Sequence, residues 1–282
     1  MIKRALKNEF SLKGLKNVIL FKYHQIKWHP VAMRTFGTCV FCGSQGEGKT
    51  LSAVQYVLHL CEMYRRCILV TNVAIKDRPF NAYLKQEKSG NYNIHSMSDD
   101  KIINTDTILL DALQEDFEPI TIEYTGLDML KNVNNKEYGV IFLIDEIHLE
   151  LNSLESKNVD IEVMVEISQQ RKQRKHIVGT SQVFMRMAKP LREQIHDVIL
   201  CRCYFGCLQY NKWIIGETAE EKNGKLEAEI KGRFLWFHRP EYYQQYNTYA
   251  KMKRYNKEWN GRKRVETMYG GVQNVECSVK SN

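Results

Sequence analysis

Long apolar runs are missing from this 282-residue sequence. No stretch approaches the ~18 consecutive apolar residues that a membrane-spanning helix needs. The most apolar windows, Val18–Phe21 and Val140–Ile144, have only the length of a strand. Proline is scarce, with five residues, and we find neither a low-complexity segment nor an internal repeat. These absences argue against a membrane span and a repeat array, and the length favours one globular domain with additions.

A secretory signal is also missing. The N-terminus is basic, but it lacks the apolar core of roughly 7–15 residues found in a signal peptide, so we expect the eight cysteines to stay reduced. Cys39 and Cys42 have the C-x-x-C spacing that zinc sites favour, and Cys201, Cys203 and Cys207 cluster later. Because Cys39 and Cys42 lie inside an apparent buried strand, we favour a packing role over a metal site.

Positive charge gathers at the two ends of the chain. The formal net charge is +8, which permits binding to a polyanion without requiring it. Residues 1–34 contain one acid, Glu9, and eight bases: Lys3, Arg4, Lys7, Lys13, Lys16, Lys22, Lys27 and Arg34. Residues 250–264 set one acid, Glu258, against Lys251, Lys253, Arg254, Lys257, Arg262, Lys263 and Arg264. The middle of the chain is close to neutral.

Both ends interleave bases with apolar or aromatic residues. The N-terminal members are Leu12, Leu15, Val18, Ile19, Phe21 and Tyr23, and this segment could lie on a membrane surface or bind nucleic acid. The C-terminal members are Tyr242, Tyr243, Tyr246, Tyr249, Tyr255 and Trp259. Their rings could stack on single-stranded DNA, or could pack a helix onto the core. No consensus for sequence-specific reading of bases appears.

From Thr38 onward, short apolar runs alternate with longer helical patterns, which is typical of an α/β fold. We expect strands at Thr38–Cys42, Cys67–Thr71, Ile120–Tyr124, Tyr138–Ile144, His176–Ser181 and Val198–Tyr204, and helices at Thr50–Arg65, Thr107–Phe117 and Ile161–Gln173. The runs are continuous rather than alternating, and this predicts a mostly parallel sheet covered on both faces.

The pattern changes after Gly206. Leu208–Ile215 and Glu227–Phe237 alternate apolar and polar residues around Asn223-Gly224, which predicts an antiparallel hairpin at the edge of the sheet. We expect the tail to be helical through Tyr242–Lys257. The predicted organisation is a basic extension at 1–36, an α/β core with its hairpin at 37–240, and an aromatic and basic tail at 241–282.

One eight-residue motif carries the most chemistry. Gly43-Ser44-Gln45-Gly46-Glu47-Gly48-Lys49-Thr50 fits the phosphate-binding pattern G-x-x-x-x-G-K-[ST] at every position, and it lies between a predicted strand and a predicted helix. The loop backbone would wrap the phosphates of ATP, and the first helical residues, through Leu51, would add the positive end of the helix dipole. Lys49 would reach the β- and γ-phosphates, and the Thr50 hydroxyl would bind Mg²⁺. The motif predicts a P-loop NTPase fold.

Two acids follow the most apolar strand. Asp145 and Glu146 would lie at the carboxyl edge of the sheet, beside the phosphate loop, where α/β sheets bind ligands. Asp145 would hold Mg²⁺ through a water molecule, and Glu146 would orient or deprotonate the attacking water. The alternative is a pair of capping residues for the following helix.

Other polar residues each allow more than one role. Thr180-Ser181-Gln182 ends the next strand, and Gln182 is the member we favour for contact with the γ-phosphate or the water; ordinary entry into a loop is the alternative. Arg171 and Arg174 lie in a basic run and could act as an arginine finger on a neighbouring subunit, with Arg186 and Arg192 as further candidates. The same run could equally be a solvated helix face.

Taken together, these motifs resemble the Zot-type (zonular occludens toxin-like) ATPases of filamentous phages, within the FtsK–HerA branch of P-loop motors. The resemblance covers roughly residues 36–250. It rests on Gly43–Thr50 running into Ala53-Val54, then Val70-Thr71-Asn72-Val73, Leu143-Ile144-Asp145-Glu146, Gln170-Arg171 to His176, Thr180-Ser181-Gln182 and Tyr246-Asn247-Thr248-Tyr249.

The resemblance implies a motor that uses ATP and Mg²⁺ to extrude or package viral DNA, working as a homo-oligomeric ring of six subunits. It assigns Lys49 and Thr50 to nucleotide and metal, Asp145 and Glu146 to metal and water, and Gln182 to sensing the γ-phosphate. Filamentous-phage members typically carry a membrane span after the ATPase domain, and this sequence has none. We therefore expect DNA packaging or translocation in the cytoplasm, that of the host if the protein is viral, with peripheral membrane contact left open.

Two alternatives remain at this stage. In the first, nucleotide only switches the conformation of an interaction protein that docks a capsid or membrane partner. In the second, the motor transfers plasmid or chromosomal DNA.

Overall fold

A computed structural model describes residues 33–34, 36–88, 90–103, 118–150, 161–222 and 225–246, together with two short strands, β13 (Arg254–Lys257) and β14 (Arg264–Thr267). The basic extension before Met33, the predicted helix Thr107–Phe117, the Asn223-Gly224 turn and Asn247–Tyr249 lie outside the described residues. In the described part of the chain, no helix is both long and apolar enough to cross a membrane.

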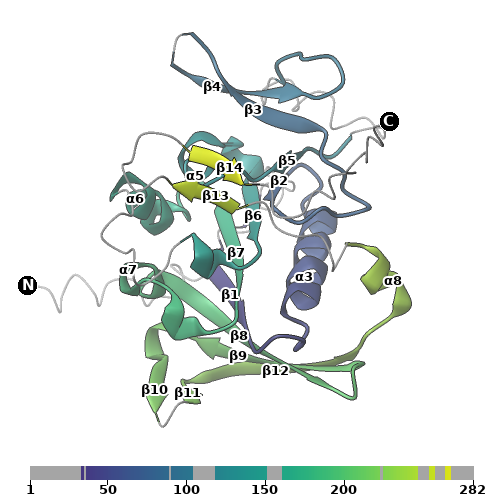
Figure 1. The fold of residues 1–282 in the computed structure, drawn as a ribbon, viewed down its shortest axis with the longest axis vertical. Helices are drawn as coiled ribbons and strands as arrows, with labels where there is room; N and C mark the ends of the chain where they lie inside the picture. The colour runs from purple at the N-terminus through teal and green to yellow at the C-terminus, as the bar shows by residue number, and fades with distance from the viewer. Residues whose placement is uncertain are drawn as a thin grey trace, which may run out of the picture.

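The described residues form a sheet of ten strands in the order β12-β9-β8-β1-β7-β6-β2-β5-β3-β4 (Figure 1). The central strands are parallel: β8 (Ile195–Tyr204), β1 (Thr38–Cys42), β7 (Lys175–Ser181), β6 (Val140–Ile144), β2 (Ile68–Thr71) and β5 (Thr121–Glu123). At one edge, β9 (Leu208–Ile215) and β12 (Ile230–Phe237) add antiparallel strands. At the other edge, β3 (Ala82–Gln86) runs parallel to β5 and pairs antiparallel with β4 (Tyr92–Ser96).

The sheet is covered on both faces, as its continuous apolar strands require. Figure 1 shows α3 (Lys49–Met63) on one side of the sheet and α5 (Met129–Asn132), α6 (Ile161–Gln169) and α7 (Lys189–Arg192) on the other. Strand β1 is buried along its whole length and contributes to both layers: Cys39 and Phe41 join the core cluster under α3, and Val40 and Cys42 join the opposite cluster.

Short elements complete the fold. Short 3₁₀ turns connect the longer elements in the described residues: η1 (Lys136–Tyr138), η2 (Ile147–Leu149), η4 (Phe184–Arg186) and η5 (Gly216–Thr218). Strands β10 (Glu220–Lys222) and β11 (Lys225–Glu227) form a small separate hairpin, and α8 (Pro240–Gln244) follows β12.

The predicted strands and the hairpin at the sheet edge are confirmed, with boundaries shifted by up to three residues. The predicted helix in the tail was wrong. We predicted a helix through Tyr242–Lys257, but α8 ends at Gln244, and Arg254–Lys257 is a strand. The backbone leaves helical geometry after Gln244 because the Lys76 amide donates to the Gln245 carbonyl at 2.6 Å and Ile75 forms a β-bridge with Tyr246.

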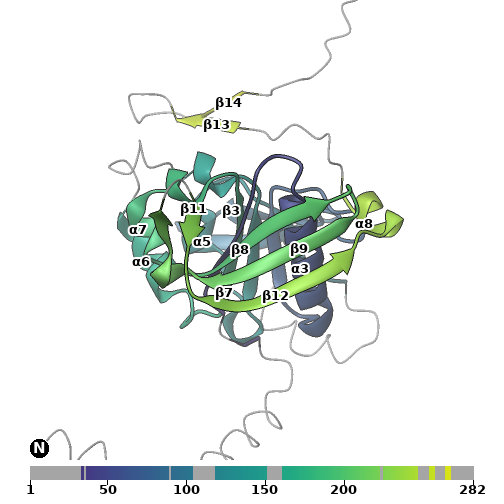
Figure 2. The same ribbon diagram turned by 90° about the horizontal axis from the view of Figure 1, so that it is seen from below.

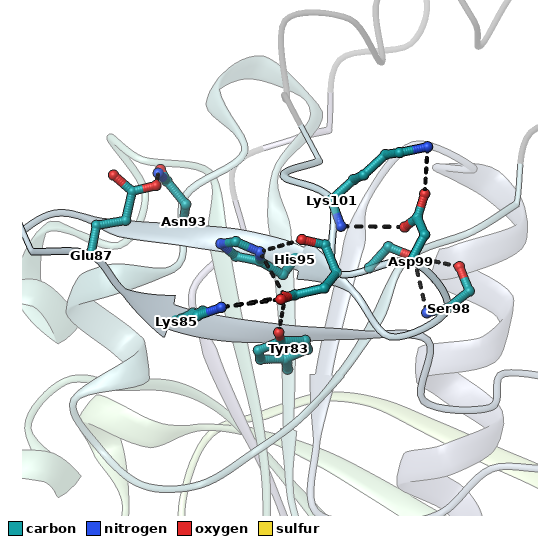
Figure 3. Close-up of polar contacts among 10 residues, drawn as sticks. Tyr83, Lys85, Glu87, Asn93, His95, Ser98, Asp99 and Lys101 are labelled. Carbon is teal, nitrogen blue, oxygen red and sulfur yellow. Dashed lines mark hydrogen bonds and ion pairs between the residues drawn. The ribbon is translucent and has the colours of Figure 1, made fainter.

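The β3–β4 hairpin is an element that the sequence pattern did not indicate. Polar side chains hold it together: Tyr83 and Lys85 on β3 and His95 on β4, all labelled in Figure 3, reach the carboxylate of Asp100. A strand pair joined by polar contacts lacks the apolar run by which buried strands are recognised.

Candidate functional site

The phosphate loop connects β1 to the first turn of α3. Gly46 and Gly48 have φ values of 83° and 72°, a region that only glycine adopts without strain. At Gly48 there is also no room for a side chain, because a Cβ atom would lie 2.2 Å from Oε1 of Gln209. The loop therefore needs glycine at this position both for its backbone conformation and for the close approach of β9.

Lys49 is the first residue of α3 and is 6% exposed. Its Nζ donates a hydrogen bond to the backbone carbonyl of Ser44 at 3.0 Å, across the curve of the loop. The ammonium group is thus already inside the loop, where a bound phosphate would compete with the Ser44 carbonyl for it.

Thr50 and Asp145 meet at the carboxyl edge of the sheet. The Thr50 hydroxyl donates to Oδ1 of Asp145 at 2.9 Å, and the Thr180 hydroxyl donates to the same oxygen at 2.6 Å. They are brought together because β7 lies between β1 and β6, so that three neighbouring parallel strands end at one point. Hydroxyl and carboxylate oxygens are the ligands that Mg²⁺ prefers, so the donor set fits this ion.

Asn72 fixes the backbone of Asp145. Its side-chain amide donates to the Asp145 carbonyl at 3.1 Å and accepts from the Asp145 amide at 2.8 Å. Asn72 directly follows β2, which pairs with β6. The reciprocal pair ties the ends of the two strands together and orients the carboxylate.

Glu146 has a left-handed backbone, with φ 53° and ψ 46°, which is uncommon for a residue with a side chain. Its amide donates to the Thr180 hydroxyl at 2.8 Å. Its carboxylate accepts from Nε2 of Gln182 at 3.2 Å, and its second oxygen lies 3.2 Å from Nδ1 of His148. Strained backbone concentrates at functional sites because the surrounding structure must hold it. Here Thr180 and Gln182 hydrogen-bond Glu146, while its second carboxylate oxygen is buried without a hydrogen-bond partner among the described residues.

The predicted residues divide into two groups. Lys49, Thr50, Asp145, Glu146 and Gln182 come together at this edge of the sheet, and the roles assigned to them stay predictions.

Arg171 and Arg174 precede β7 and lie at the opposite edge, where the parallel strands begin. The Arg174 guanidinium donates to the carbonyl of Met33, whereas Arg171 is exposed. Arg186, in η4, is exposed, and it follows Gln182 by four residues. The guanidinium of Arg192 contacts Sδ of Met185.

Strand β9 contributes residues to the site, and the sequence analysis did not predict them. Gln209 is completely buried, and its Nε2 donates to the Glu47 carbonyl at 3.0 Å and to Oδ1 of Asn211 at 2.8 Å. Asn211 donates to the hydroxyl of Ser52, in the first turn of α3, and the Cys203 amide donates to Oε2 of Glu47. The one available signal was a pair of side-chain amides, Gln209 and Asn211, on the same face of β9 as Trp213.

The C-x-x-C pair is structural. Cys39 and Cys42 belong to core clusters on opposite faces of the sheet, so their sulfur atoms cannot share one metal ion. Burial raises the pKa of both thiols. Among the residues that the structure describes, no group of three or more His, Cys, Asp or Glu side chains could hold a metal.

A separate groove of about 810 Å³ runs along α3. Its walls come from α3, β8, β9, β12 and α8, and include the rings of Trp213, Trp236 and Tyr242. Lys49, Thr50 and Asp145 do not line it, so the groove is distinct from the phosphate loop.

Comparisons with known proteins find similarity only among solved structures. No protein-family model and no curated protein matches the chain. The N-terminal domain of zonular occludens toxin from Neisseria meningitidis is 15% identical, covers 77% of this chain and 100% of that chain, and has a TM-score of 0.45. The genome packaging NTPase B204 from Sulfolobus turreted icosahedral virus 2, in complex with ATP-gammaS, is 11% identical, covers 61% of this chain and 77% of that chain, and has a TM-score of 0.37.

The fold follows from the topology and does not depend on these similarities. A glycine-rich loop joins the buried strand β1 to α3, an acidic pair ends β6, and β7 lies between the two with its polar end beside both. The chain has the fold of a P-loop nucleoside triphosphatase.

Proposed function

We propose that the chain is an ATP-hydrolysing motor that works as an oligomer and translocates or packages viral DNA. The observation that carries the hydrolytic part is the 2.9 Å contact between Thr50 and Asp145, with Glu146 as the next residue. This contact brings together a phosphate loop, a pair of metal-binding oxygens and an acid that can act on water.

The loop residues Gly43–Thr50 and the N–H of Leu51 would bind the triphosphate. Lys49 would exchange the Ser44 carbonyl for the β- and γ-phosphates, and Thr50 and Asp145 would hold Mg²⁺ directly or through water. The ion, when bound, neutralises the charge that develops on the phosphates. The side chains need no large movement for this, because Thr50 and Asp145 already face one another.

Glu146 is the residue placed to orient or deprotonate the attacking water. It follows the metal-binding Asp145; Gln182 donates to one carboxylate oxygen, and the other, 3.2 Å from Nδ1 of His148, is buried without a hydrogen-bond partner among the described residues. Gln182 comes from the end of β7, between the phosphate loop and the acidic strand end, so its amide can respond to the γ-phosphate and to Glu146 together. A simple nucleotide switch does not need this second acid.

Three features support the oligomer and the DNA substrate. The Zot-type pattern of motifs implies a ring, and the basic ends of the sequence suit a polyanion. Arg171 and Arg186 are exposed, so either could reach the nucleotide of a neighbouring subunit. Arg171 lies at the edge of the sheet opposite its own phosphate loop and could therefore serve only in trans.

ATP turnover of the full chain tests the hydrolytic proposal. We expect Lys49→Ala and Glu146→Gln to reduce turnover by at least a hundredfold, and Glu146→Gln to keep nucleotide affinity because it leaves the loop intact. Lys172→Ala and Glu118→Gln remove charges at exposed positions and serve as matched controls. Wild-type turnover in the Glu146→Gln variant would instead support a nucleotide-switched interaction protein.

Oligomeric mass, measured with and without ATP and DNA, tests the motor. We expect a ring in which Arg171→Ala or Arg186→Ala lowers turnover while the mass stays unchanged. A chain that stays monomeric with both ligands, and that DNA does not stimulate, would contradict the motor.

A further inference from the structure

The outer strands of the sheet carry a regular surface on the face opposite α3. In β8, β9 and β12, residues alternate between the two faces. Gln209, Trp213 and Trp236 face α3, since Gln209 contacts the phosphate loop and both tryptophans pack on the cluster under α3. Their neighbours along the strands point the other way. Figure 2 shows the three strands running side by side across the molecule.

The pairing register arranges these neighbours in a grid of three rows. Each row takes one residue from β8, β9 and β12 in turn. The rows are Leu200, Lys212 and Arg233, then Arg202, Tyr210 and Leu235, then Tyr204, Leu208 and Phe237. By the usual spacing of strands, the grid measures roughly 13 Å along the strands and about 10 Å across them.

All charged residues of this grid are positive. It holds three cations, three aromatic rings, three leucines and no acid. Within the described part of the chain, Arg202, Lys212 and Arg233 form no ion pair with a carboxylate. The carboxylates that touch these strands are engaged elsewhere: Glu47 by the Cys203 amide, and Asp197 by Trp213 and Lys231.

Three of the six rings and leucines of the grid are exposed, whereas Leu200, Leu208 and Tyr210 are half-buried and Leu200 packs against a core cluster. Tyr204, Leu235 and Phe237 are 40%, 64% and 68% exposed, and the Arg202 guanidinium lies over the Tyr204 ring at 5.9 Å. Next to the third row, at the turn between β8 and β9, Phe205 is 94% exposed with a φ of 53°. An aromatic residue in that backbone region costs free energy, and the side chain gains no packing in return.

The β10–β11 hairpin lies beside the first row of the grid and ends the grid on that side. Leu226 and Ala228 pack against the core cluster that contains Val198 and Ile214, the residues that precede the first row. The two strands of this hairpin carry charges of both signs, in the sequences Glu220–Lys222 (EEK) and Lys225–Glu227 (KLE). Because the hairpin ends the grid on this side, the open part of the grid extends toward the end of β8 that passes the phosphate loop.

We propose that this face of β8, β9 and β12 is a binding surface for single-stranded nucleic acid. Cations that form no ion pair match a phosphate backbone. Exposed rings offer stacking surfaces to unpaired bases, which a duplex cannot present. This proposal rests on the proposed function, because DNA translocation would supply the single-stranded nucleic acid. It adds the place on the protein where that nucleic acid binds. The same strand segment serves two sites, since Cys203 and Gln209 hold Glu47 of the phosphate loop while their neighbours Arg202 and Tyr210 lie in the grid.

Fluorescence anisotropy with labelled oligonucleotides tests the surface, without ATP so that hydrolysis plays no part. The probes are a single-stranded DNA, an RNA of the same sequence, and a duplex. We expect the triple variant Arg202→Ala, Lys212→Ala, Arg233→Ala to bind the single strands at least tenfold more weakly. The slope of log affinity against log salt concentration should become less steep by about 2, because each of the three lost phosphate contacts contributes ~0.7 to it.

A matched control separates position from total charge. Lys76, Lys88 and Lys172 are exposed cations that lie outside β8, β9 and β12. Replacing all three by alanine lowers the formal net charge by the same three units, and we expect affinity within twofold of wild type. Equal losses in the two triple variants would overturn the proposal.

A second set of variants tests stacking. Tyr204→Leu, Tyr210→Leu and Phe237→Leu together keep the face apolar but remove its rings, and we expect at least a tenfold loss for single strands with little change in salt slope. If ring removal leaves binding intact but changes the oligomeric mass, the face is a contact between subunits and the proposal is wrong. Duplex binding as tight as single-strand binding would also overturn it.

The single variant Arg233→Ala, on the exposed edge strand, keeps the test usable if a triple variant unfolds. We expect a loss of several-fold from this change alone, and wild-type affinity would count against the proposal. Lys49→Ala distinguishes the two proposals: we expect it to abolish ATP turnover and to leave this binding unchanged.

Discussion

Lowering the pH from 7 to 5 should destabilise the fold through His176, in β7. The side chain is 1% exposed. One ring nitrogen, Nδ1, lies 2.7 Å from the carbonyl of Gly37, and the other, Nε2, lies 3.0 Å from the hydroxyl of Tyr56. A carbonyl can only accept, so Nδ1 carries the proton and Nε2 accepts from Tyr56. The neutral ring therefore satisfies both partners.

Burial lowers the pKa of His176 to about 4, from an ordinary value of 6.5. The unfolded chain takes up a proton near pH 6.5 and the folded chain only near pH 4, so protonation favours unfolding between these values. The stability that the neutral ring provides is complete above about pH 6.5 and is lost as the pH falls to 4. Between pH 6.5 and pH 4 this loss amounts to roughly 3 kcal/mol, of which about 2 kcal/mol is lost by pH 5.

Urea unfolding at several pH values between 7.5 and 4.5 measures this loss. Carboxylates also titrate in the range, so the informative quantity is the difference between wild type and His176→Gln, which hydrogen-bonds but does not ionise. We expect the free energy of unfolding of wild type to fall more steeply than that of the variant below pH 6.5. His59→Gln, at a side chain that is 70% exposed, is the matched control and should follow wild type. Parallel curves for wild type and His176→Gln, or a measured pKa above 6 for His176, would refute the reasoning.

Three further changes test the architecture of the nucleotide site. Thr180→Val keeps the side-chain shape but leaves the Asp145 carboxylate and the Glu146 amide without their partner; we expect at least a tenfold loss of turnover with a smaller change in KM, and an unaltered kcat would contradict it. Gly48→Ala places a methyl group against Gln209 at a positive φ, so nucleotide affinity measured by calorimetry should fall by more than tenfold; wild-type affinity would show that the loop relaxes freely. Gln209→Ala removes a buried amide that holds the loop, and urea unfolding should show a loss of about 1–3 kcal/mol together with weaker nucleotide binding. An equally stable variant would mean that water replaces the amide.

Local sequence was sufficient for the centre of the site. The phosphate loop and Asp145 each follow a buried strand, and the carboxyl ends of parallel strands meet at one edge, so their proximity could be predicted without knowing the strand order. The same rule shows why Arg171 was harder to place. It precedes β7, and the residues before a parallel strand lie at the edge opposite those after it.

Other parts of the site depend on the register between distant strands. The contact of Gln209 with Glu47 joins residues 162 positions apart, and no local pattern specifies it. The grid on β8, β9 and β12 is visible only once Arg202 is known to pair with Tyr210, and Tyr210 with Leu235. Hairpin β3–β4 was missed for a related reason, since its stabilising contacts converge on Asp100, outside both strands.

The hold of β9 on the phosphate loop has a consequence for how the chain matures. The residues that we propose to bind nucleotide all come from the first two thirds of the sequence, whereas Cys203 and Gln209, which hold Glu47 of the loop, come after them. Contacts between residues so distant in sequence form slowly, because a large loop of chain must close first. A chain that ends before Cys203 therefore contains the whole phosphate loop but lacks both groups that hold Glu47 in place.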